Sequence, residues 1–350
     1  MDTVKQEAED SAPDRGRWHG VRKWFLRLLK WGIVFLVLWA IRRTLVEAWN
    51  QVGSAQWNFA PQWLLLAGGV YLLGLLPAGI YWFVCLRRLG QRPGWFSTLR
   101  AYYVGGLGKY VPGKAMVIIL RTGMIRGPGV HTAVAAASVF LETLTMMCVG
   151  AFLGAIFLAG QAWAGKTHPF LLAVAVALIP AALVPTLPPV FRLGLGIVLR
   201  RLPVGTSENP ETRLRSLRMN TLAVGWLLMA ALWFLWGASF LAVLKATQQV
   251  EIRWGQDLWP ATASVALATV AGFAVLIVPG GIGVREAALA EIMVPLLAER
   301  TTHPELLAVV SAALLRLVWV LAELAVSAIL MMMGPSSKSL SPIENRNKPR

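Results

Sequence analysis

The sequence predicts an all-α, polytopic membrane protein, and its composition and hydropathy pattern support this. Of its 350 residues, 57% are hydrophobic and only 14% are charged, whereas soluble domains are about 45–50% apolar and about 25% charged. Apolar segments near the roughly 20 residues that a helix needs to cross a bilayer alternate with polar loops. The two cysteines, Cys85 and Cys148, lie in apolar segments, so their positions indicate neither a disulfide framework nor a metal-binding pair.

Eight apolar segments are predicted as spans or partial spans, and their ranges are 24–41, 63–86, 130–160, 170–190, 221–244, 259–278, 287–298 and 306–333. The first is followed by Arg42 and Arg43 rather than by a small-residue cleavage site, so we expect it to remain as an anchor. The segment 287–298 is too short to span comfortably and is predicted to be a half-helix or a re-entrant segment.

Basic residues predict the orientation. Of the 33 Lys and Arg residues, 25 lie in four stretches: 1–30, 86–130, 191–220 and 334–350. The positive-inside rule therefore predicts that both termini and both long loops face the cytoplasm. Topology accounts for most of the net charge of +16, so nucleic acid is not predicted as a partner.

One transmembrane domain is predicted over 24–333, between disordered cytoplasmic tails at 1–23 and 334–350. The tails are polar and could not bury a core. The loop 86–130 holds eight basic and no acidic residues, a pattern that favours a segment lying in or dipping into the membrane interface. No loop is much longer than this one, so no appended soluble catalytic domain is expected.

Two similar stretches favour a four-plus-four internal repeat. Gly105-Gly-Leu-Gly-Lys-Tyr-Val-Pro-Gly-Lys114 follows the second predicted span, and Val278-Pro-Gly-Gly-Ile-Gly-Val-Arg-Glu286 follows the sixth, each at the expected cytoplasmic side. Paired Gly and Pro interruptions are typical of transporter binding sites, because they free backbone groups that only protein or a water-filled cavity can satisfy. Alternatively, each Pro-Gly simply turns the chain between two helices.

Charged residues inside apolar spans are the second indication of a site. Glu142 lies near mid-depth of the third span, and Arg316 and Glu323 share a face of the last one, too far apart to pair with each other. With Glu286 they could form one buried network around a polar cavity. They could equally be structural ion pairs that fix helix packing.

A phosphate-bearing headgroup is the predicted ligand of these stretches. The candidate binding residues are Lys109, Tyr110, Pro112, Gly113, Lys114, Arg121, Pro279, Gly280, Gly281, Gly283, Arg285 and Arg316, with Glu142, Glu286 and Glu323 as buried acidic partners. The glycine-rich run before Lys109 lacks the spacing of a P-loop. The four histidines are scattered and no acidic cluster is evident, so no catalytic residue, metal or cofactor is predicted.

Three features resemble the lysylphosphatidylglycerol synthase transmembrane-region family of flippase-like proteins: Gly108-Lys-Tyr-Val-Pro-Gly-Lys114 with Arg121 and Glu142, the run 278–286, and Arg316 with Glu323. The resemblance extends over roughly residues 25–333. It implies a multi-pass protein of the cell inner (cytoplasmic) membrane. In bifunctional members the membrane region moves a modified lipid between leaflets, and a separate soluble domain transfers the aminoacyl group from tRNA.

No such soluble domain is expected in this sequence, so the synthase activity is not implied for it. The sequence also departs from one branch of the family, because Lys114-Ala-Met-Val replaces the Pro-Gly-Arg-x-Gly-Glu pattern of that branch. This second departure argues against a lysyl-lipid substrate. The predicted function is therefore translocation or handling of an anionic or lipid-linked phosphate substrate among membrane lipids, without enzymatic activity.

Two alternative functions stay open at this point. One is a membrane-embedded transferase acting on a lipid, with Glu142 or Glu286 as general base. The other is a non-catalytic partner of an envelope lipid or glycan synthesis system, which would be inactive alone.

Overall fold

The computed structural model describes residues 58–111, 115–127, 129–165, 169–187, 189–190, 193, 219–274 and 283–333. The predicted span 24–41 and the predicted tails 1–23 and 334–350 lie outside these residues. Within them the chain forms α-helices and short 3-10 helices and no β-strand, which confirms the all-α fold.

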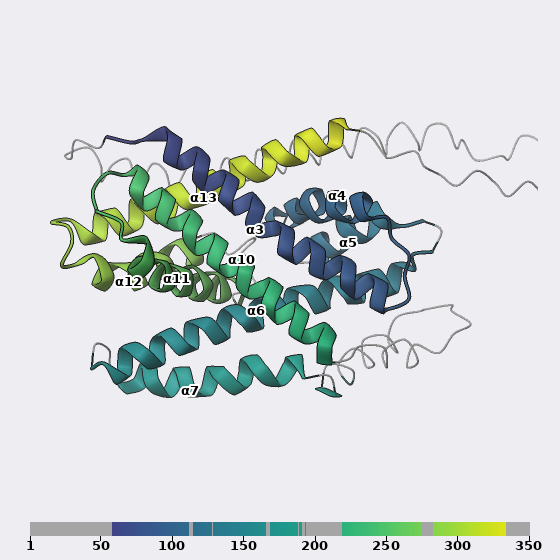
Figure 1. Ribbon diagram of the computed structural model, residues 1–350, viewed down its shortest axis with the longest axis horizontal. Coiled ribbons are helices and arrows are strands. Elements are labelled where there is room, and N and C mark those ends of the chain that lie inside the picture. The colour runs from purple at the N-terminus through teal and green to yellow at the C-terminus, as the bar shows by residue number, and fades with distance from the viewer. Residues whose placement is uncertain are drawn as a thin grey trace, which may run out of the picture. The chain divides into compact units, whose positions relative to one another are not determined.

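The elements run in the following order (Figure 1): α3 Pro61–Arg88, α4 Trp95–Gly106, η1 Leu107–Tyr110, α5 Ala115–Ile125, α6 Thr132–Trp163, α7 Pro169–Leu183, η2 Val184–Thr186, α10 Met219–Ala246, α11 Trp254–Ala274, α12 Val284–Leu297 and α13 Pro304–Met332. In the described ranges four helices, α3, α6, α10 and α13, are long and apolar enough to cross a membrane. The chain is therefore a polytopic helical membrane protein.

The remaining predicted spans differ from the helices that form. The segment predicted as 170–190 becomes α7 and the short η2, and 259–278 corresponds to α11, which begins at Trp254. The segment 287–298 forms α12, which has only 14 residues. The predicted interfacial loop 86–130 contains two helices, α4 and α5, with 12 and 11 residues. Both α4 and α5 are shorter than the roughly 20 residues that a membrane-spanning helix needs, so hydropathy does not indicate them as spans.

The centre of the fold is the pair α3 and α10, which pack along their length in antiparallel directions (Figure 1). At one end, the Ala60 amide donates to the Ala246 carbonyl at 2.9 Å. At the other end, a Cβ on Gly225 of α10 would lie 2.7 Å from the Tyr81 Oη of α3. In lipid the hydrophobic effect does not drive helices together, so their association depends on close packing. Small residues such as glycine allow this packing.

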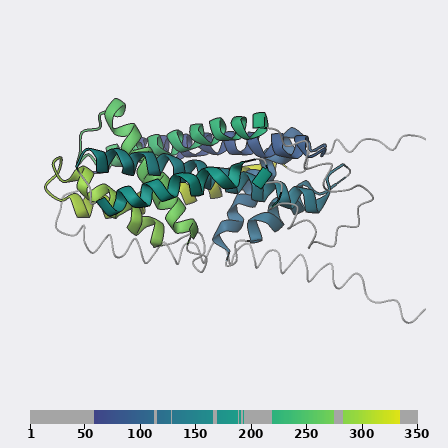
Figure 2. The same ribbon diagram turned by 90° about the horizontal axis from the view of Figure 1, so that it is seen from below.

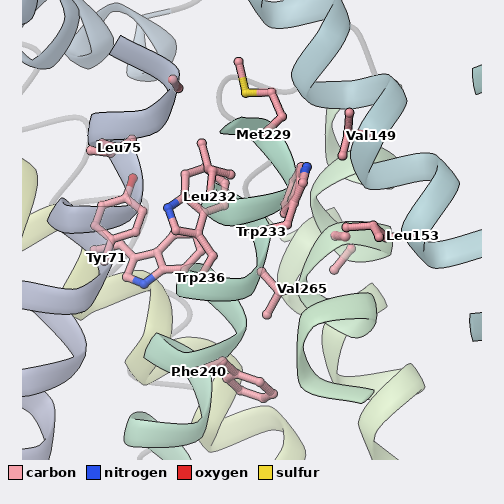
Figure 3. Packing of buried hydrophobic residues seen from close by; sticks show 14 of the residues in the cluster. Tyr71, Leu75, Val149, Leu153, Met229, Leu232, Trp233, Trp236, Phe240 and Val265 are labelled. Carbon is pink, nitrogen blue, oxygen red and sulfur yellow. The ribbon is translucent and has the colours of Figure 1, made fainter. Parts of the chain in front are cut away.

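A buried aromatic layer fills the space around α10 (Figure 3). Trp236 contacts Trp233 edge-on, with ring centroids 5.2 Å apart, and lies 4.8 Å from the Trp319 ring of α13. Trp319 in turn stacks on Tyr71 of α3 at 4.1 Å. These contacts fix α3 and α13 relative to each other, and with them the polar side chains described below.

The same order of elements occurs twice. A helix of 28 residues, a shorter helix, a Val-Pro-Gly run, a short helix and a long helix make up α3–α6 and again α10–α13. The packing partners correspond as well, because α4 packs on α13 as α11 packs on α6, and α3 packs on α13 as α10 packs on α6. The structure thus supports a four-plus-four repeat, but with α4 and α5 as members in place of the segment 24–41 and α7.

The two halves are inverted relative to each other, because their first helices are antiparallel. The pairs α4–α5 and α11–α12 accordingly lie toward opposite ends of the α3 and α10 helices (Figures 1 and 2). Each pair is a helical hairpin closed at its base. In the first, the Arg92 amide donates to the Gly129 carbonyl; in the second, Arg300 forms an ion pair with Asp257 at 2.8 Å. Inverted repeats of this kind are typical of secondary transporters.

Candidate functional site

Glu323 of α13 is buried and receives three hydrogen-bond donors from other elements. Its Oε1 accepts from the Tyr71 hydroxyl of α3 and from the Lys109 ammonium of η1, and its Oε2 accepts from the Tyr110 hydroxyl at 3.0 Å. Lys109 also donates to the Tyr71 hydroxyl at 3.3 Å. Because η1 is the tip of the α4–α5 hairpin, Glu323 holds this tip against α3 and α13.

This arrangement lies near the middle of the long helices. Arg316 is twelve residues from the start of α13 and sixteen from its end, so at about 1.5 Å per residue it is close to the helix midpoint. The tip residue Tyr110 packs there, with the Arg316 guanidinium 5.2 Å from its ring centroid. The described residues before the first Val-Pro-Gly run therefore do not form a surface loop, because they follow α4, which packs on α3 and α13. The expected cytoplasmic side of the two runs stays a prediction.

The first turn of α12 adds two charged side chains, Arg285 and Glu286, beside α13. The Arg285 guanidinium lies over the Trp319 ring at 4.3 Å, and the Glu286 carboxylate approaches Arg316, with 3.6 Å between Oε1 and Nε. The other Glu286 oxygen accepts from the Gly283 amide at 2.6 Å and caps the helix. Gly283 has φ of 82°, a conformation that favours glycine.

Two buried polar atoms at this position make no hydrogen bond within the described residues. They are Nη2 of Arg316 and Oε1 of Glu286. The Arg316 side chain is only 9% exposed, so its guanidinium cannot rely on bulk water. Buried polar groups are normally paired, so Nη2 of Arg316 is a donor that a ligand or an ordered water molecule could satisfy.

The electrostatics at this place favour an anion. Lys109, Arg285 and Arg316 carry three positive charges, and Glu286 and Glu323 carry two negative ones. These five described side chains therefore have one excess positive formal charge. We call these five residues, together with Tyr71 and Tyr110, the central site.

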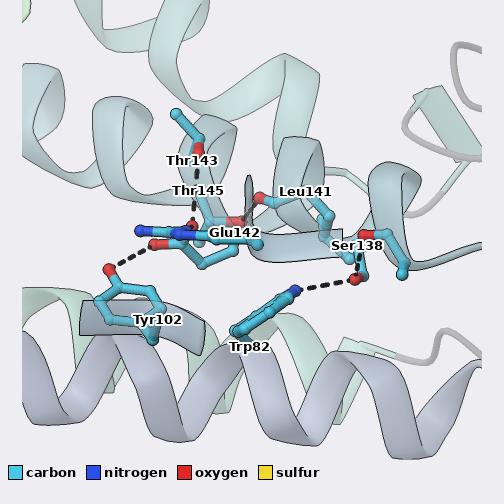
Figure 4. A network of polar contacts seen from close by, with 9 residues as sticks. Trp82, Tyr102, Ser138, Leu141, Glu142, Thr143 and Thr145 are labelled. Carbon is cyan, nitrogen blue, oxygen red and sulfur yellow. Dashed lines mark hydrogen bonds and ion pairs between the residues drawn. The ribbon is translucent and has the colours of Figure 1, made fainter. Parts of the chain in front are cut away.

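A second buried network joins the first hairpin to α6 (Figure 4). Arg121 of α5 pairs with Glu142 at 2.8 Å, and the Tyr102 hydroxyl of α4 donates to the same carboxylate at 3.0 Å. The Arg121 guanidinium also lies 3.9 Å from the Tyr102 ring centroid. Nearby, the Trp82 indole of α3 donates to Ser138 at 2.9 Å. Here each charge has an opposite partner, which is typical of a contact that fixes helix packing.

The structure divides the predicted single network in two. Glu286, Arg316 and Glu323 meet at the central site with Lys109, Tyr110 and Arg285, and Gly283 caps the adjoining helix. Glu142 and Arg121 form the other network, and no hydrogen bond of the described residues links the two. Six predicted binding residues lie outside the described ranges: Pro112, Gly113, Lys114, Pro279, Gly280 and Gly281.

Three residues that position these networks were not predicted. The Tyr71 and Tyr102 hydroxyls donate to Glu323 and Glu142, respectively. The Arg285 guanidinium lies over the Trp319 ring. A tyrosine in an apolar span carries a hydroxyl that needs a partner, and this was the signal available for Tyr71. Within the described ranges, no group of three or more His, Cys, Asp or Glu side chains is placed to hold a metal ion.

The fold and the central site define a multi-pass helical membrane protein that encloses a charged site between its long helices. The family model for the lysylphosphatidylglycerol synthase transmembrane region matches residues 27–322, most of the chain. The chain therefore belongs to this family, which connects it with membrane lipids. No curated protein matches it.

Proposed function

We propose that the protein translocates a phosphate-bearing lipid across the cell inner membrane, with both termini in the cytoplasm. The observation that carries this proposal is the excess positive charge of the central site, near the middle of helices long enough to span a bilayer. The family's connection with membrane lipids supports it as well.

The cations of the central site bind the phosphate, and the carboxylates orient them. Arg316 offers the unpaired Nη2, and Arg285 and Lys109 approach from the tips of the two hairpins. Charge-assisted hydrogen bonds from guanidinium and ammonium groups are the strong contacts that phosphates make in proteins. Because the two hairpins approach the site from opposite ends, either could open a path to one side of the membrane.

The test is transbilayer movement of labelled lipids in proteoliposomes that contain the wild type or Arg316→Ala. We expect movement of one class, either a phospholipid or a polyprenyl-phosphate lipid, and its loss in the variant. Asp257→Ala is the matched control, because it removes an ion pair at a hairpin base, away from the site; it should retain movement.

Two other results would overturn the proposal. Conversion of the labelled lipid to a new product would indicate a membrane-embedded transferase. Lipid movement no faster than in empty liposomes, from folded protein, would exclude autonomous translocation. Movement that is restored by a co-purifying envelope-synthesis protein would then favour the role of a non-catalytic partner.

A further inference from the structure

We infer that the Glu323 carboxylate is an internal occupant of the central site, and that a substrate phosphate displaces it with the uptake of one proton. This inference rests on the proposed function and names how the same site is regulated. It assigns to Glu323 a competing role in addition to the orientation of cations.

The donors around Glu323 are those that a phosphate would use. Two hydroxyls and one ammonium, from Tyr71, Tyr110 and Lys109, converge on its two oxygens. Two non-bridging oxygens of a phosphodiester accept the same kind of hydrogen bonds from the same donors. The carboxylate therefore occupies the position in which an anionic ligand would be held most strongly.

The ion pair of Glu323 is also more open than that of Glu142. The Lys109 side chain is 35% exposed, whereas Arg121 is 8% exposed in the pair with Glu142. Lysine is a flexible point charge that can change partner, while the planar guanidinium of Arg121 also packs on the Tyr102 ring. An incoming anion can reach Lys109 and draw it away from Glu323.

After displacement, the Glu323 carboxyl group is either ionised or protonated. Around Glu323 lie the Tyr71 hydroxyl from α3, Lys109 and Tyr110 from η1, and Arg316 on its own helix. Arg285 and Glu286 of α12 lie next to Arg316. Once the anion holds the cations, an ionised Glu323 would be buried beside a second negative charge, which is strongly unfavourable. It therefore takes a proton from water, and the displaced group is the neutral acid. Net charge is balanced, since one anion and one proton enter together.

The experiment is calorimetric binding of a short-chain phosphatidylglycerol to the detergent-solubilised full chain, because its phosphodiester keeps one negative charge across the neutral pH range. Titrations in two buffers of different ionisation enthalpy give the protons taken up per anion. We expect about one proton for the wild type, and an affinity that falls about tenfold for each pH unit raised. If the wild type takes up no proton when it binds the probe, the inference is wrong, whether or not any variant folds.

Glu323→Gln removes the competing charge and keeps the size of the side chain. We expect it to bind the probe at least tenfold more tightly than the wild type at alkaline pH, with no pH dependence. Asp257→Asn neutralises a carboxylate elsewhere and should keep the pH dependence of the wild type. Weaker binding by a folded Glu323→Gln protein would show that Glu323 is needed for the anion rather than exchanged for it.

The results separate this inference from the proposed function. Lipid movement that depends on Arg316, together with anion binding without proton uptake, contradicts only the exchange at Glu323. If the wild type binds no short-chain phosphatidylglycerol at any pH, the exchange at Glu323 is wrong, whereas the proposed function is decided separately by lipid movement in proteoliposomes.

Discussion

Replacement of Glu142 by alanine is expected to lower the free energy of unfolding by about 3–5 kcal/mol, because it leaves the Arg121 guanidinium buried without its carboxylate. The same change removes the acceptor of the Tyr102 hydroxyl. Both partners belong to the α4–α5 hairpin, so the loss acts on the contact between this hairpin and α6. Thermal unfolding of the purified protein in detergent, followed by tryptophan fluorescence, measures the effect.

A paired replacement tests whether the Glu142 network is structural. Arg121→Met combined with Glu142→Leu removes both charges and retains apolar volume, so it should recover most of the stability lost in Glu142→Ala. If the double variant is stable and still moves lipid, the ion pair only fixes packing. If Glu142→Ala is as stable as the wild type, the buried pair contributes little to holding the hairpin on α6, and our interpretation of this network is wrong.

Gly237→Val is expected to lower the free energy of unfolding by about 3 kcal/mol or more, which is at the upper end of the range for overpacking. A Cβ at Gly237 of α10 would lie 2.7 and 2.8 Å from the Thr262 Cα and amide nitrogen of α11. These atoms belong to the backbone and cannot rotate away. The two helices would therefore have to separate, and the packing of α11 on α10 would loosen.

The control for this packing prediction is Gly69→Val in α3, where an added Cβ meets no atom within 4 Å. We expect Gly69→Val to purify as a monodisperse protein with a melting temperature near that of the wild type. Gly237→Val should aggregate or melt well below it in the same detergent. Equal melting temperatures would mean that α10 and α11 can move apart at little cost.

Hydropathy predicted the four long spans well because each one must satisfy its own backbone in lipid, and this requires a long apolar helix. The segments 63–86, 130–160, 221–244 and 306–333 each correspond to one of these helices. The two hairpins were harder to predict. The stretch 86–130 is rich in basic residues, and its helices are short, so neither its length nor its composition indicates that it runs inward along α13.

Charge position alone predicted that Arg316 and Glu323 need partners on other helices, since seven residues separate them. It did not predict which partners, because Lys109 and Glu323 are 214 residues apart in the chain. Only the docking of η1 on α13 brings them into contact. The division between Glu142 and the other acids has the same origin, since Arg121 and Tyr102 reach Glu142 from one hairpin.

The sequence by itself determined that this chain is an all-α membrane protein, and which polar residues lie within its apolar part. Those properties follow from local composition and from the need of a lipid-embedded backbone for helices. The tertiary structure alone decided that α4 and α5 belong to the repeat, and that the Glu323 donors converge near mid-helix. These depend on the antiparallel packing of α3 and α10, a contact between residues far apart in the chain that no local pattern specifies.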